Sequence, residues 1–391
     1  MEDQVHDQFT CFVSKLMEVR KSKKCIEKTD TDGNNGITDI FRWLRNNSPR
    51  LNNNSKQLLL DSGLVEICLW YFDVHFHDDL LSLSILLQFL ANFSINYKPA
   101  QQMIFKDFHS TLRNHLLSSY DTKLLNNTIM LLYNLSLPNN DLRSIILGDV
   151  EIIKKILNCW QQKELEYCKI FLDSLFFNHD EFLSVYNNLS CSDKKNLLDV
   201  LSYWLEHYND DVPLELVNTI KDELFLECAI DQITSPVVKV LAKASSMDKF
   251  KSSIQTHTAF LKKLIEVLKY IHESSKSSSG NKDEFSQAKN LSALFTNSEI
   301  TNHSRFWFKS DVIQLIANIC YNHEEHQNLM RTHNIIPILL ECCSFDAKNP
   351  LMREWSLFAL RNILDGNLDN QTFLANIDSV GSIDPESVVT L

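Results

Sequence analysis

A chain of 391 residues is ample for a sizeable core and is too long for one ordinary compact domain. It contains only 7 Gly and 8 Pro, too few for the tight turns of sheets or barrels and for phosphate-cradling loops, so the composition favours long helices. The net charge of −12 disfavours binding to the phosphate backbone of nucleic acids, and we expect no nucleic-acid partner.

The first segment, residues 1–50, is expected to be helical, with a polar, turn-rich loop at 27–36. The chain opens without a basic stretch leading into an apolar one, so no signal peptide is expected. The longest apolar stretch, 80–93, is about 14 residues and falls short of the roughly 20 that a membrane helix needs. Ten scattered Cys without a CxxC pair are typical of free thiols in a reducing compartment, which favours a cytosolic or nuclear protein, and we expect a cytoplasmic one.

An internal repeat begins in the second segment, residues 51–272, and returns near the end of the chain. Similar apolar runs align on four asparagines, Asn92, Asn134, Asn318 and Asn362. The first two asparagines are 42 residues apart and the last two are 44 apart, while armadillo and HEAT repeats have periods of about 40–47. The sequence therefore predicts an all-α fold, a right-handed helical solenoid of the armadillo/HEAT kind.

Further positions repeat around the asparagines. A Gln follows nine residues later in three copies: Gln101, Gln327 and Gln371. A second Asn follows four or five residues later: Asn96, Asn322 and Asn367. Upstream, the segments 63–67 and 334–338 correspond, and 171–175 is interpreted as a degenerate copy with Ser174 in place of the Asn. One repeat is therefore expected to contain a first helix, a connector and an Asn-bearing helix.

The Asn-bearing helices are apolar on nearly every face. In 85–93 the larger polar residues are Gln88 and Asn92, and in the corresponding C-terminal helix they are Gln314 and Asn318. Each pair is spaced i, i+4 and so lies on one stripe of the helix. A helix that is apolar elsewhere is packed between neighbours, as the inner helix of a solenoid is.

The rest of the chain divides into three segments. Residues 273–300 begin with a Ser-rich stretch and are expected to be a low-complexity insertion. Residues 301–377 hold the C-terminal repeats, in which Asn349-Pro350 is expected to cap the last Asn-bearing helix. Residues 378–391 form a short acidic tail.

The sequence favours neither a catalytic motif nor a metal-binding motif. The segment from His323 to His326 resembles a zinc-protease motif but is one residue too short, and we interpret it as a turn between helices. The segment 75–79, with two His and two Asp, is interpreted as a solvated connector, and the neighbouring acids at 210–211 point apart. We therefore expect no catalytic residue, no metal site and no cofactor.

The C-terminal repeats resemble the ataxin-10 family. The similarity runs through 308–321, continues in Asn349-Pro350-Leu351-Met352-Arg353-Glu354-Trp355 and ends in 360–367. It implies a non-catalytic armadillo-like scaffold that acts through protein partners, including a G-protein beta subunit and the O-GlcNAc transferase. The family resemblance also implies links to neurite outgrowth and neuron survival, cytokinesis and the ciliary base, with a cytoplasmic, perinuclear, midbody or ciliary-base location and possible homo-oligomers.

The aligned polar residues are the candidate partner-binding site, as a stripe on the concave face. The stripe comprises Asn92, Asn134, Asn318, Asn362, Gln88, Gln314 and Arg361. Resemblance to importin-alpha implies that such an Asn binds the backbone of an extended peptide, since an amide both donates and accepts hydrogen bonds. The alternative is that each Asn satisfies a neighbouring helix end. Importin-alpha carries a Trp four residues before its Asn, whereas this chain has Gln88, Met130, Gln314 and Phe358 there. A binding scaffold is therefore preferred, with an importin-like peptide adaptor or a metal-binding enzyme as alternatives.

Overall fold

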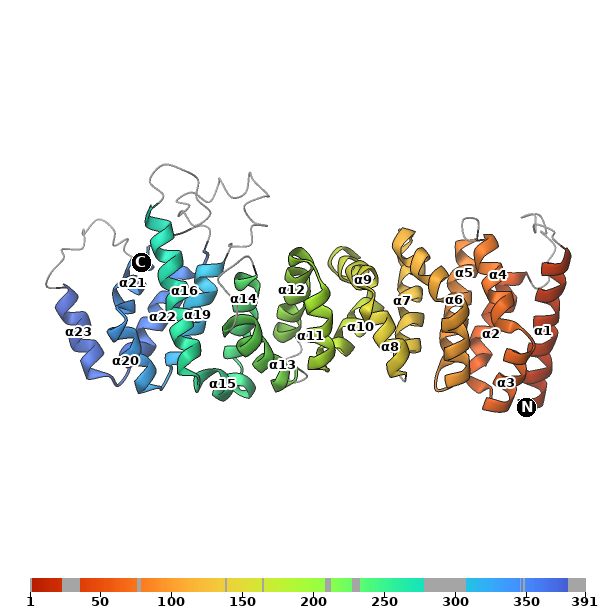
Figure 1. The fold of residues 1–391 in the computed structure, drawn as a ribbon, viewed down its shortest axis with the longest axis horizontal. Helices are drawn as coiled ribbons and strands as arrows, with labels where there is room; N and C mark the ends of the chain where they lie inside the picture. The colour runs from red at the N-terminus through yellow and green to blue at the C-terminus, as the bar shows by residue number, and fades with distance from the viewer. Residues whose placement is uncertain are drawn as a thin grey trace. The chain divides into compact units, whose positions relative to one another are not determined.

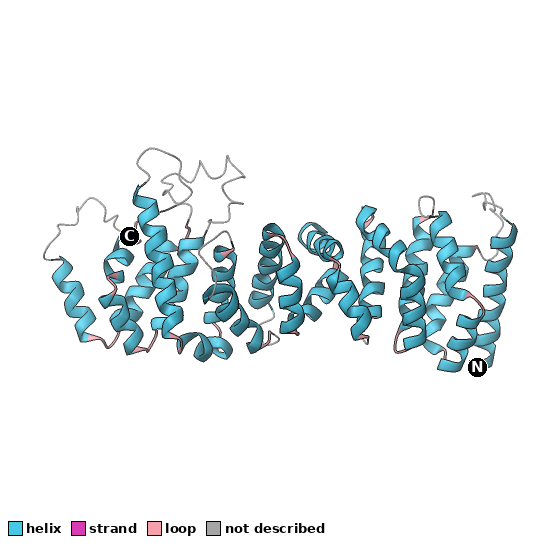
Figure 2. Cartoon of the chain, in the orientation of Figure 1, coloured by secondary structure: helices cyan, strands magenta, loops and turns pink. Residues whose placement is uncertain are grey.

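The structure is a computed structural model. It describes residues 2–22, 36–75, 79–137, 139–163, 165–207, 212–226, 233–277, 307–344, 346 and 349–378. All regular structure within these ranges is helical, as Figure 2 shows, and the predicted all-α class is confirmed. None of the helices in these ranges combines the length and apolar character of a membrane-spanning segment. Nearly all of the 27–36 loop, most of the 273–300 insertion and nearly all of the 378–391 tail lie outside the described residues.

The chain divides into two compact units, unit 1 with residues 1–175 and 180–189 and unit 2 with residues 176–179 and 190–391. The helices in or mostly in unit 1 are α1 (Glu2–Ser22), α2 (Ile37–Asn47), η1 (Ser48–Arg50), α3 (Asn53–Asp61), α4 (Leu64–His75), α5 (Leu80–Ser94), α6 (Lys98–Ser118), α7 (Thr122–Ser136), α8 (Asn140–Gly148), α9 (Val150–Lys163), α10 (Glu166–Phe176) and α11 (His179–Asn188). Those in unit 2 are α12 (Cys191–His207), α13 (Leu214–Thr219), the π-helical turn η2 (Ile220–Leu226), α14 (Thr234–Ser245), α15 (Asp248–Gln255), α16 (Thr258–Ser277), α19 (Phe308–Cys320), α20 (Glu324–Thr332), α21 (Ile335–Glu341), α22 (Met352–Leu364) and α23 (Leu368–Asp378).

Each unit stacks repeats side by side, as Figure 1 shows. Complete repeats contain three helices, a short one, a second one and an inner one that carries the aligned Asn: α3–α4–α5 in unit 1 and α20–α21–α22 in unit 2. Within each unit the inner helices lie side by side, in the order α2, α5, α7 in unit 1 and α12, α14, α19, α22 in unit 2. This arrangement confirms the armadillo-like solenoid, with one more helix per repeat than the sequence pattern indicated. We call these helices the inner row.

The inner helices are buried on most faces because their neighbours cover both sides. In α5, Leu86, Leu87, Phe89 and Leu90 are fully buried, and only Leu80, Leu81 and two polar positions are notably accessible among its fifteen residues. Burial of a Leu or Phe side chain stabilises the fold by about 1.5–3 kcal/mol, so the stacking of inner helices is a major source of stability. The prediction that these helices lie between neighbours is confirmed.

Tight turns explain two of the repeated sequence positions. Gly63 and Asn334, which open the two matching upstream segments, have φ angles of 83° and 60° and directly precede α4 and α21. Asn96 and Asn322 both have φ of 53° just after an inner helix, and Gly366 has φ of 67° at the same place after α22. Asn and Gly are the residues that adopt this left-handed conformation at least cost.

The structure corrects two expectations at these helix ends. Asn367 is not the counterpart of Asn96, because Gly366 holds the turn and the Asn367 side chain instead accepts from Asn370 N–H at 3.0 Å, in the first turn of α23. Asn349 does not cap α22, which begins at Met352. Its side chain accepts from the backbone N–H of Lys309 at 3.0 Å, in the first turn of α19. The cap is therefore made to the neighbouring inner helix.

Candidate partner-binding surface

The aligned asparagines join successive inner helices. The amide Nδ2 of Asn134 donates to Ala91 O at 3.3 Å, and the amide of Asn362 donates to Ala317 O at 2.9 Å. In both cases the accepting carbonyl belongs to the residue that precedes the Asn of the previous repeat. One amide thus fixes the register of each inner helix against its neighbour, and we call this series of hydrogen bonds the Asn ladder.

The ladder extends to two helices that lack a recognisable repeat. Asn92 Nδ2 donates to Arg45 O at 3.2 Å, which identifies α2 as an inner helix with Asn46 at the ladder position. In unit 2, Asn318 Nδ2 donates to the hydroxyl of Ser245 at 2.9 Å, and that hydroxyl donates to Ala242 O at 2.7 Å. By this register Lys243 occupies the ladder position of α14.

The repeated glutamines bind the ends of the inner helices. Gln101 Nε2 donates to Ser94 O at 3.0 Å, and Gln371 Nε2 donates to Leu364 O at 2.8 Å. Gln327 Nε2 lies within hydrogen-bonding distance of three carbonyl oxygens, those of Cys320 at 3.4 Å, Asn362 at 2.9 Å and Asp365 at 3.3 Å. The last carbonyls of a helix lack intrahelical partners, so these amides donate hydrogen bonds to carbonyls that would otherwise have no donor.

Each ladder amide keeps unused capacity. Nδ2 makes the hydrogen bonds described above, whereas within the described residues no hydrogen bond reaches Oδ1 of Asn92, Asn134 or Asn318, which are half-buried. Asn362 is 4% exposed and its amide is accordingly less accessible to a partner. The ladder therefore has a structural role through its donors, and binding of a partner by its acceptors stays a prediction.

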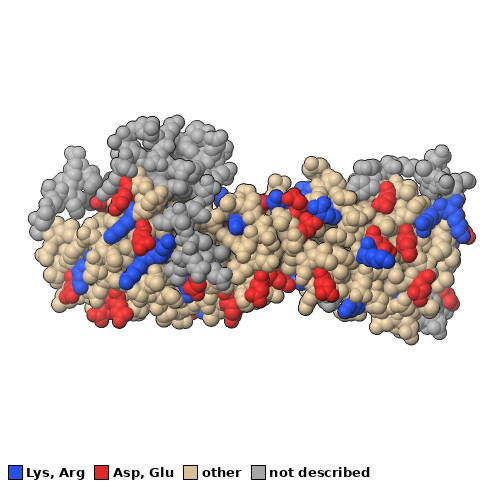
Figure 3. Space-filling view, in the orientation of Figure 1, with Lys and Arg blue, Asp and Glu red and all other residues tan. Residues whose placement is uncertain are grey.

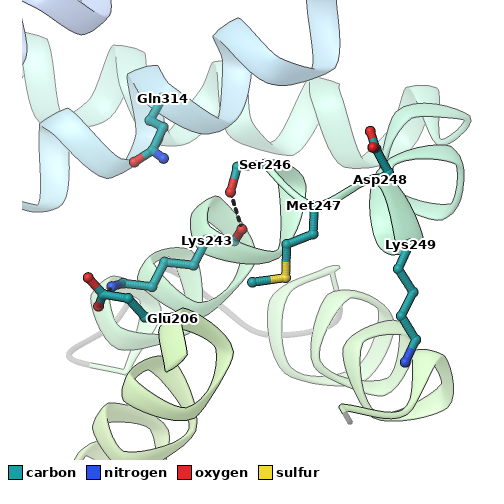
Figure 4. Close-up of a pocket in the computed structure, with 7 residues that line it drawn as sticks. All are labelled: Glu206, Lys243, Ser246, Met247, Asp248, Lys249 and Gln314. Carbon is teal, nitrogen blue, oxygen red and sulfur yellow. Dashed lines mark hydrogen bonds and ion pairs between the residues drawn. The ribbon is translucent and has the colours of Figure 1, made fainter. Parts of the chain in front are cut away.

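The polar residues one turn before the ladder differ between the units. In unit 1, Gln88 accepts from Arg45 Nη1 at 2.8 Å and donates to Asn127 Oδ1 at 3.4 Å, while Asn127 donates to the hydroxyl of Ser84 at 2.7 Å. These contacts form a continuous series of side-chain hydrogen bonds from α2 through α5 to α7. In unit 2 the corresponding residue is Gln314, whose side chain makes no hydrogen bond with the described residues and borders a hollow (Figure 4).

Ion pairs replace amides between α12 and α14. Lys239 Nζ lies 2.9 Å from Asp199 Oδ1, and Lys243 Nζ forms an ion pair with Glu206. These four residues do not follow from the repeated Asn and Gln, so the sequence pattern did not predict them. The i, i+4 spacing of the two lysines was the available signal, since it places both on one stripe of α14.

Arg361 and its neighbours lie at the last inner helix. Arg361 is exposed and precedes Asn362, as Arg45 precedes Asn46, and Arg45 reaches across to Gln88 on the next inner helix. Phe358 is 36% exposed and meets half-buried Trp355 edge to face, with ring centroids 5.9 Å apart. This end of unit 2 thus presents a guanidinium beside accessible aromatic surface.

The His-containing segments show no gathered metal ligands in the described ranges. There, no three His, Cys, Asp or Glu side chains lie close enough together to hold a metal ion. His323 accepts from His326 N–H at 3.4 Å at the start of α20, and burial lowers the pKa of His326. Residues 76–78 of the other His-bearing segment and the acids at 210–211 lie outside the described residues.

Comparison with known proteins relates this solenoid to one family. The domain family described as "Spinocerebellar ataxia type 10 protein domain" matches residues 308–390. Ataxin-10 of Homo sapiens is 24% identical over 378 residues, an alignment that covers 89% of this chain and 77% of the human protein. The chain is thus similar to ataxin-10 over most of its length. The ataxin-10 homolog of Dictyostelium discoideum is 35% identical over 74 residues, which cover 19% of this chain and 12% of the homolog.

The solved structures that match this chain share little sequence with it. Computationally designed armadillo repeat proteins for modular peptide recognition are 12% identical, with 90% of this chain and 98% of the designed chain covered and a TM-score of 0.26. A chain from a study of the interaction between cadherin and beta-catenin is 13% identical, with 91% and 67% covered and a TM-score of 0.35. The fold assignment rests on the chain's own helices and Asn ladder.

Proposed function

We propose that this ataxin-10-like protein is a non-catalytic scaffold that binds protein partners along its inner row. The observation that carries the proposal is the set of half-buried amides whose donors fix the repeats while their acceptors stay unused. An unused acceptor on a half-buried surface favours a ligand that supplies N–H groups, and an extended polypeptide supplies one at every second residue along each edge. Peptide capture by backbone hydrogen bonds is an established mode of recognition.

The similarity to ataxin-10 supports finer proposals. We propose partners of the kinds that the family resemblance implies, a G-protein beta subunit and the O-GlcNAc transferase, and self-association as a further possibility of the same surfaces. We also propose roles in neurite outgrowth and neuron survival, cytokinesis or the ciliary base, and a cytoplasmic location. On the face drawn in Figure 3, acidic and basic side chains of the described residues are interspersed, which is compatible with protein partners.

The test is affinity capture from a cell extract with wild-type protein and an inner-row variant. The variant is Gln314→Ala with Phe358→Ala and Arg361→Ala, because none of these three side chains takes part in the Asn ladder. Circular dichroism and thermal unfolding should match wild type, while specific partner proteins should be lost from the captured set. A matched control, Ile145→Ala with Asp141→Asn on exposed positions of α8, should capture the wild-type set.

The outcomes separate clearly. Loss of the same partners from both variants, or their full retention by the inner-row variant, refutes binding along the inner row of unit 2. The scaffold proposal itself is refuted if the wild-type protein captures no proteins other than those that an unrelated control bait also captures.

A further inference from the structure

Two free thiols of unit 1 lie next to each other where α9 is followed by α10. Cys159 lies one turn before the end of α9, and Cys168 lies in the first turn of α10. A hydrogen bond joins their two thiol groups. Cys159 is 3% exposed, whereas Cys168 is fully buried. Helix ends open locally at a small cost in free energy, so a small solute reaches Cys159 before Cys168.

Two lysine ammonium groups flank the first of these thiols. Lys155 and Lys163 lie four residues before and four residues after Cys159, so the three side chains share one stripe of α9. Lys155 Nζ donates to Ser119 O at 3.2 Å. Lys163 Nζ donates to Tyr120 O at 2.8 Å, also in the turn between α6 and α7. No carboxylate of the described residues forms an ion pair with either lysine, so their positive charges act on the thiol between them.

This environment favours the thiolate of Cys159. The hydrogen bond from Cys168 and the charges of the two flanking lysines lower the pKa of the Cys159 thiol, although burial acts in the opposite direction. The same hydrogen bond, burial and the charge of Cys159 raise the pKa of Cys168, which therefore stays protonated. By contrast, burial raises the pKa of the Cys68 and Cys320 thiols. A thiolate beside cations is the nucleophilic form of cysteine, and a second thiol next to it can complete a disulfide.

We propose that Cys159 and Cys168 form a modification site at which a hydroperoxide produces a reversible disulfide between α9 and α10. The Cys159 thiolate attacks the hydroperoxide, so that an S–O bond forms, the O–O bond breaks and the leaving oxyanion takes a proton from the solvent. The Cys168 thiol then attacks the sulfenic acid, so that the S–S bond forms, the S–O bond breaks and the Cys168 proton leaves as water. The two sulfur atoms together lose two electrons, and the hydroperoxide gains them.

The inference goes beyond the proposed scaffold function and does not depend on it, because neither cysteine belongs to the inner row. Its chemical consequence is a covalent link between two successive helices of unit 1. A dithiol reductant reverses the link by thiol–disulfide exchange, which restores both thiols.

The test exposes the reduced full chain to a small excess of hydrogen peroxide at neutral pH, then blocks the remaining thiols with N-ethylmaleimide in denaturant. Trypsin places the two cysteines on separate peptides, 156–163 and 164–169. Mass spectrometry should find these peptides joined, at a mass two hydrogen atoms below their sum, and dithiothreitol should separate them. At the same time point the pair should be oxidised at least about tenfold more than Cys68 and Cys320, since thiols of raised pKa supply little thiolate at neutral pH.

Substitutions separate the two steps. Cys168→Ser should leave a sulfenic acid at Cys159, which dimedone traps, and Cys159→Ser should keep Cys168 reduced. Lys155→Gln and Lys163→Gln should each slow the loss of free Cys159 thiol about threefold, the effect of one unit charge at about 6 Å in water. Lys154→Gln removes the same charge from the same helix but off the stripe, and this matched control should react at the wild-type rate.

Three results would overturn the proposal, with circular dichroism verifying that each variant keeps the wild-type fold. The first is that peroxide oxidises the wild-type chain without joining peptides 156–163 and 164–169. The second is that Cys168 is oxidised as readily in Cys159→Ser as in wild type. The third is that Lys155→Gln and Lys163→Gln react at the same rate as Lys154→Gln. Partner capture by the inner row is unaffected by all three results.

Discussion

Asn362→Ala tests whether the Asn ladder holds the repeats in register. The Asn362 side chain is 4% exposed, and its amide donates to Ala317 O at 2.9 Å across two inner helices. Alanine removes the donor and leaves a poorly hydrated carbonyl, a loss of about 1–3 kcal/mol in the free energy of unfolding. Asn92→Ala is the internal comparison, because Asn92 is half-buried and its 3.2 Å hydrogen bond can be replaced by water. We expect that change to cost about 0.5–1.5 kcal/mol.

The measurement has to be local, because stacked repeats can unfold in parts and a single global transition is not assured. Hydrogen exchange followed by mass spectrometry on peptides of α19 and α22 reports the opening free energy of those two helices. Asn362→Ala should lower it, whereas exchange in α5 should stay at the wild-type level. Asn362→Asp should lower it further, since a carboxylate would face the Ala317 carbonyl oxygen without a proton to donate. The reasoning fails if Asn362→Ala changes the opening free energy by less than about 0.5 kcal/mol, or if Asn92→Ala is the costlier change.

Three further changes follow from the same contacts. Gln327→Ala should lower the free energy of unfolding by about 2 kcal/mol, because buried carbonyls lose their hydrogen-bond donor. Gln371→Ala, at an exposed helix end, should cost under about 0.5 kcal/mol. Urea titrations of the two variants check the difference. Gly366→Ala should cost about 1 kcal/mol through its φ of 67° alone, since a Cβ there would meet nothing within 4 Å, and a thermal unfolding scan tests it. Asp311→Asn should stabilise the protein at pH 8 and have little effect near pH 4. Burial raises the native pKa of Asp311 to about 7, above its pKa in the unfolded chain. Ionisation therefore destabilises the wild-type fold as pH rises from about 4 to about 7, by at most about 4 kcal/mol. Unfolding measured at several pH values would contradict this if the variant were less stable than wild type at pH 8.

The fold was predictable because the hydrophobic periodicity and the recurring Asn of the sequence both mark the inner helices. The period of 42 to 44 residues identified four inner helices, and the Gln nine residues later marked the ends of three of them. The direction of each amide was not predictable, since the sequence cannot tell whether an Asn meets a neighbouring carbonyl or a ligand. The structure assigns Nδ2 of Asn362 to Ala317 O and leaves the ligand question to experiment.

Other features escaped because their partners are distant in sequence or their residues are atypical. Asn349 looked like the cap of the helix that follows it, but its partner, Lys309 N–H, is 40 residues earlier. Leu351 occupies a left-handed turn with φ of 61°, a conformation that Leu disfavours and that no sequence rule assigns to it. The hollow beside Gln314 was not predicted, because Lys243 stands where other inner helices carry Asn. Of the residues that line it, the sequence pattern singled out Gln314 alone.

Two kinds of joint connect the inner helices of unit 2, and they respond differently to the solvent. Between α19 and α22 the joint is an uncharged amide on a backbone carbonyl, which dissolved ions barely affect. Between α12 and α14 it is a pair of lysine–carboxylate contacts with partly exposed side chains, and their attraction is screened over about 8 Å at physiological ionic strength. A rise in salt concentration therefore weakens the ion pairs between α12 and α14 and leaves the amide contact between α19 and α22 nearly unchanged. Ionic strength thus acts on the inner helices of unit 2 at the step from α12 to α14.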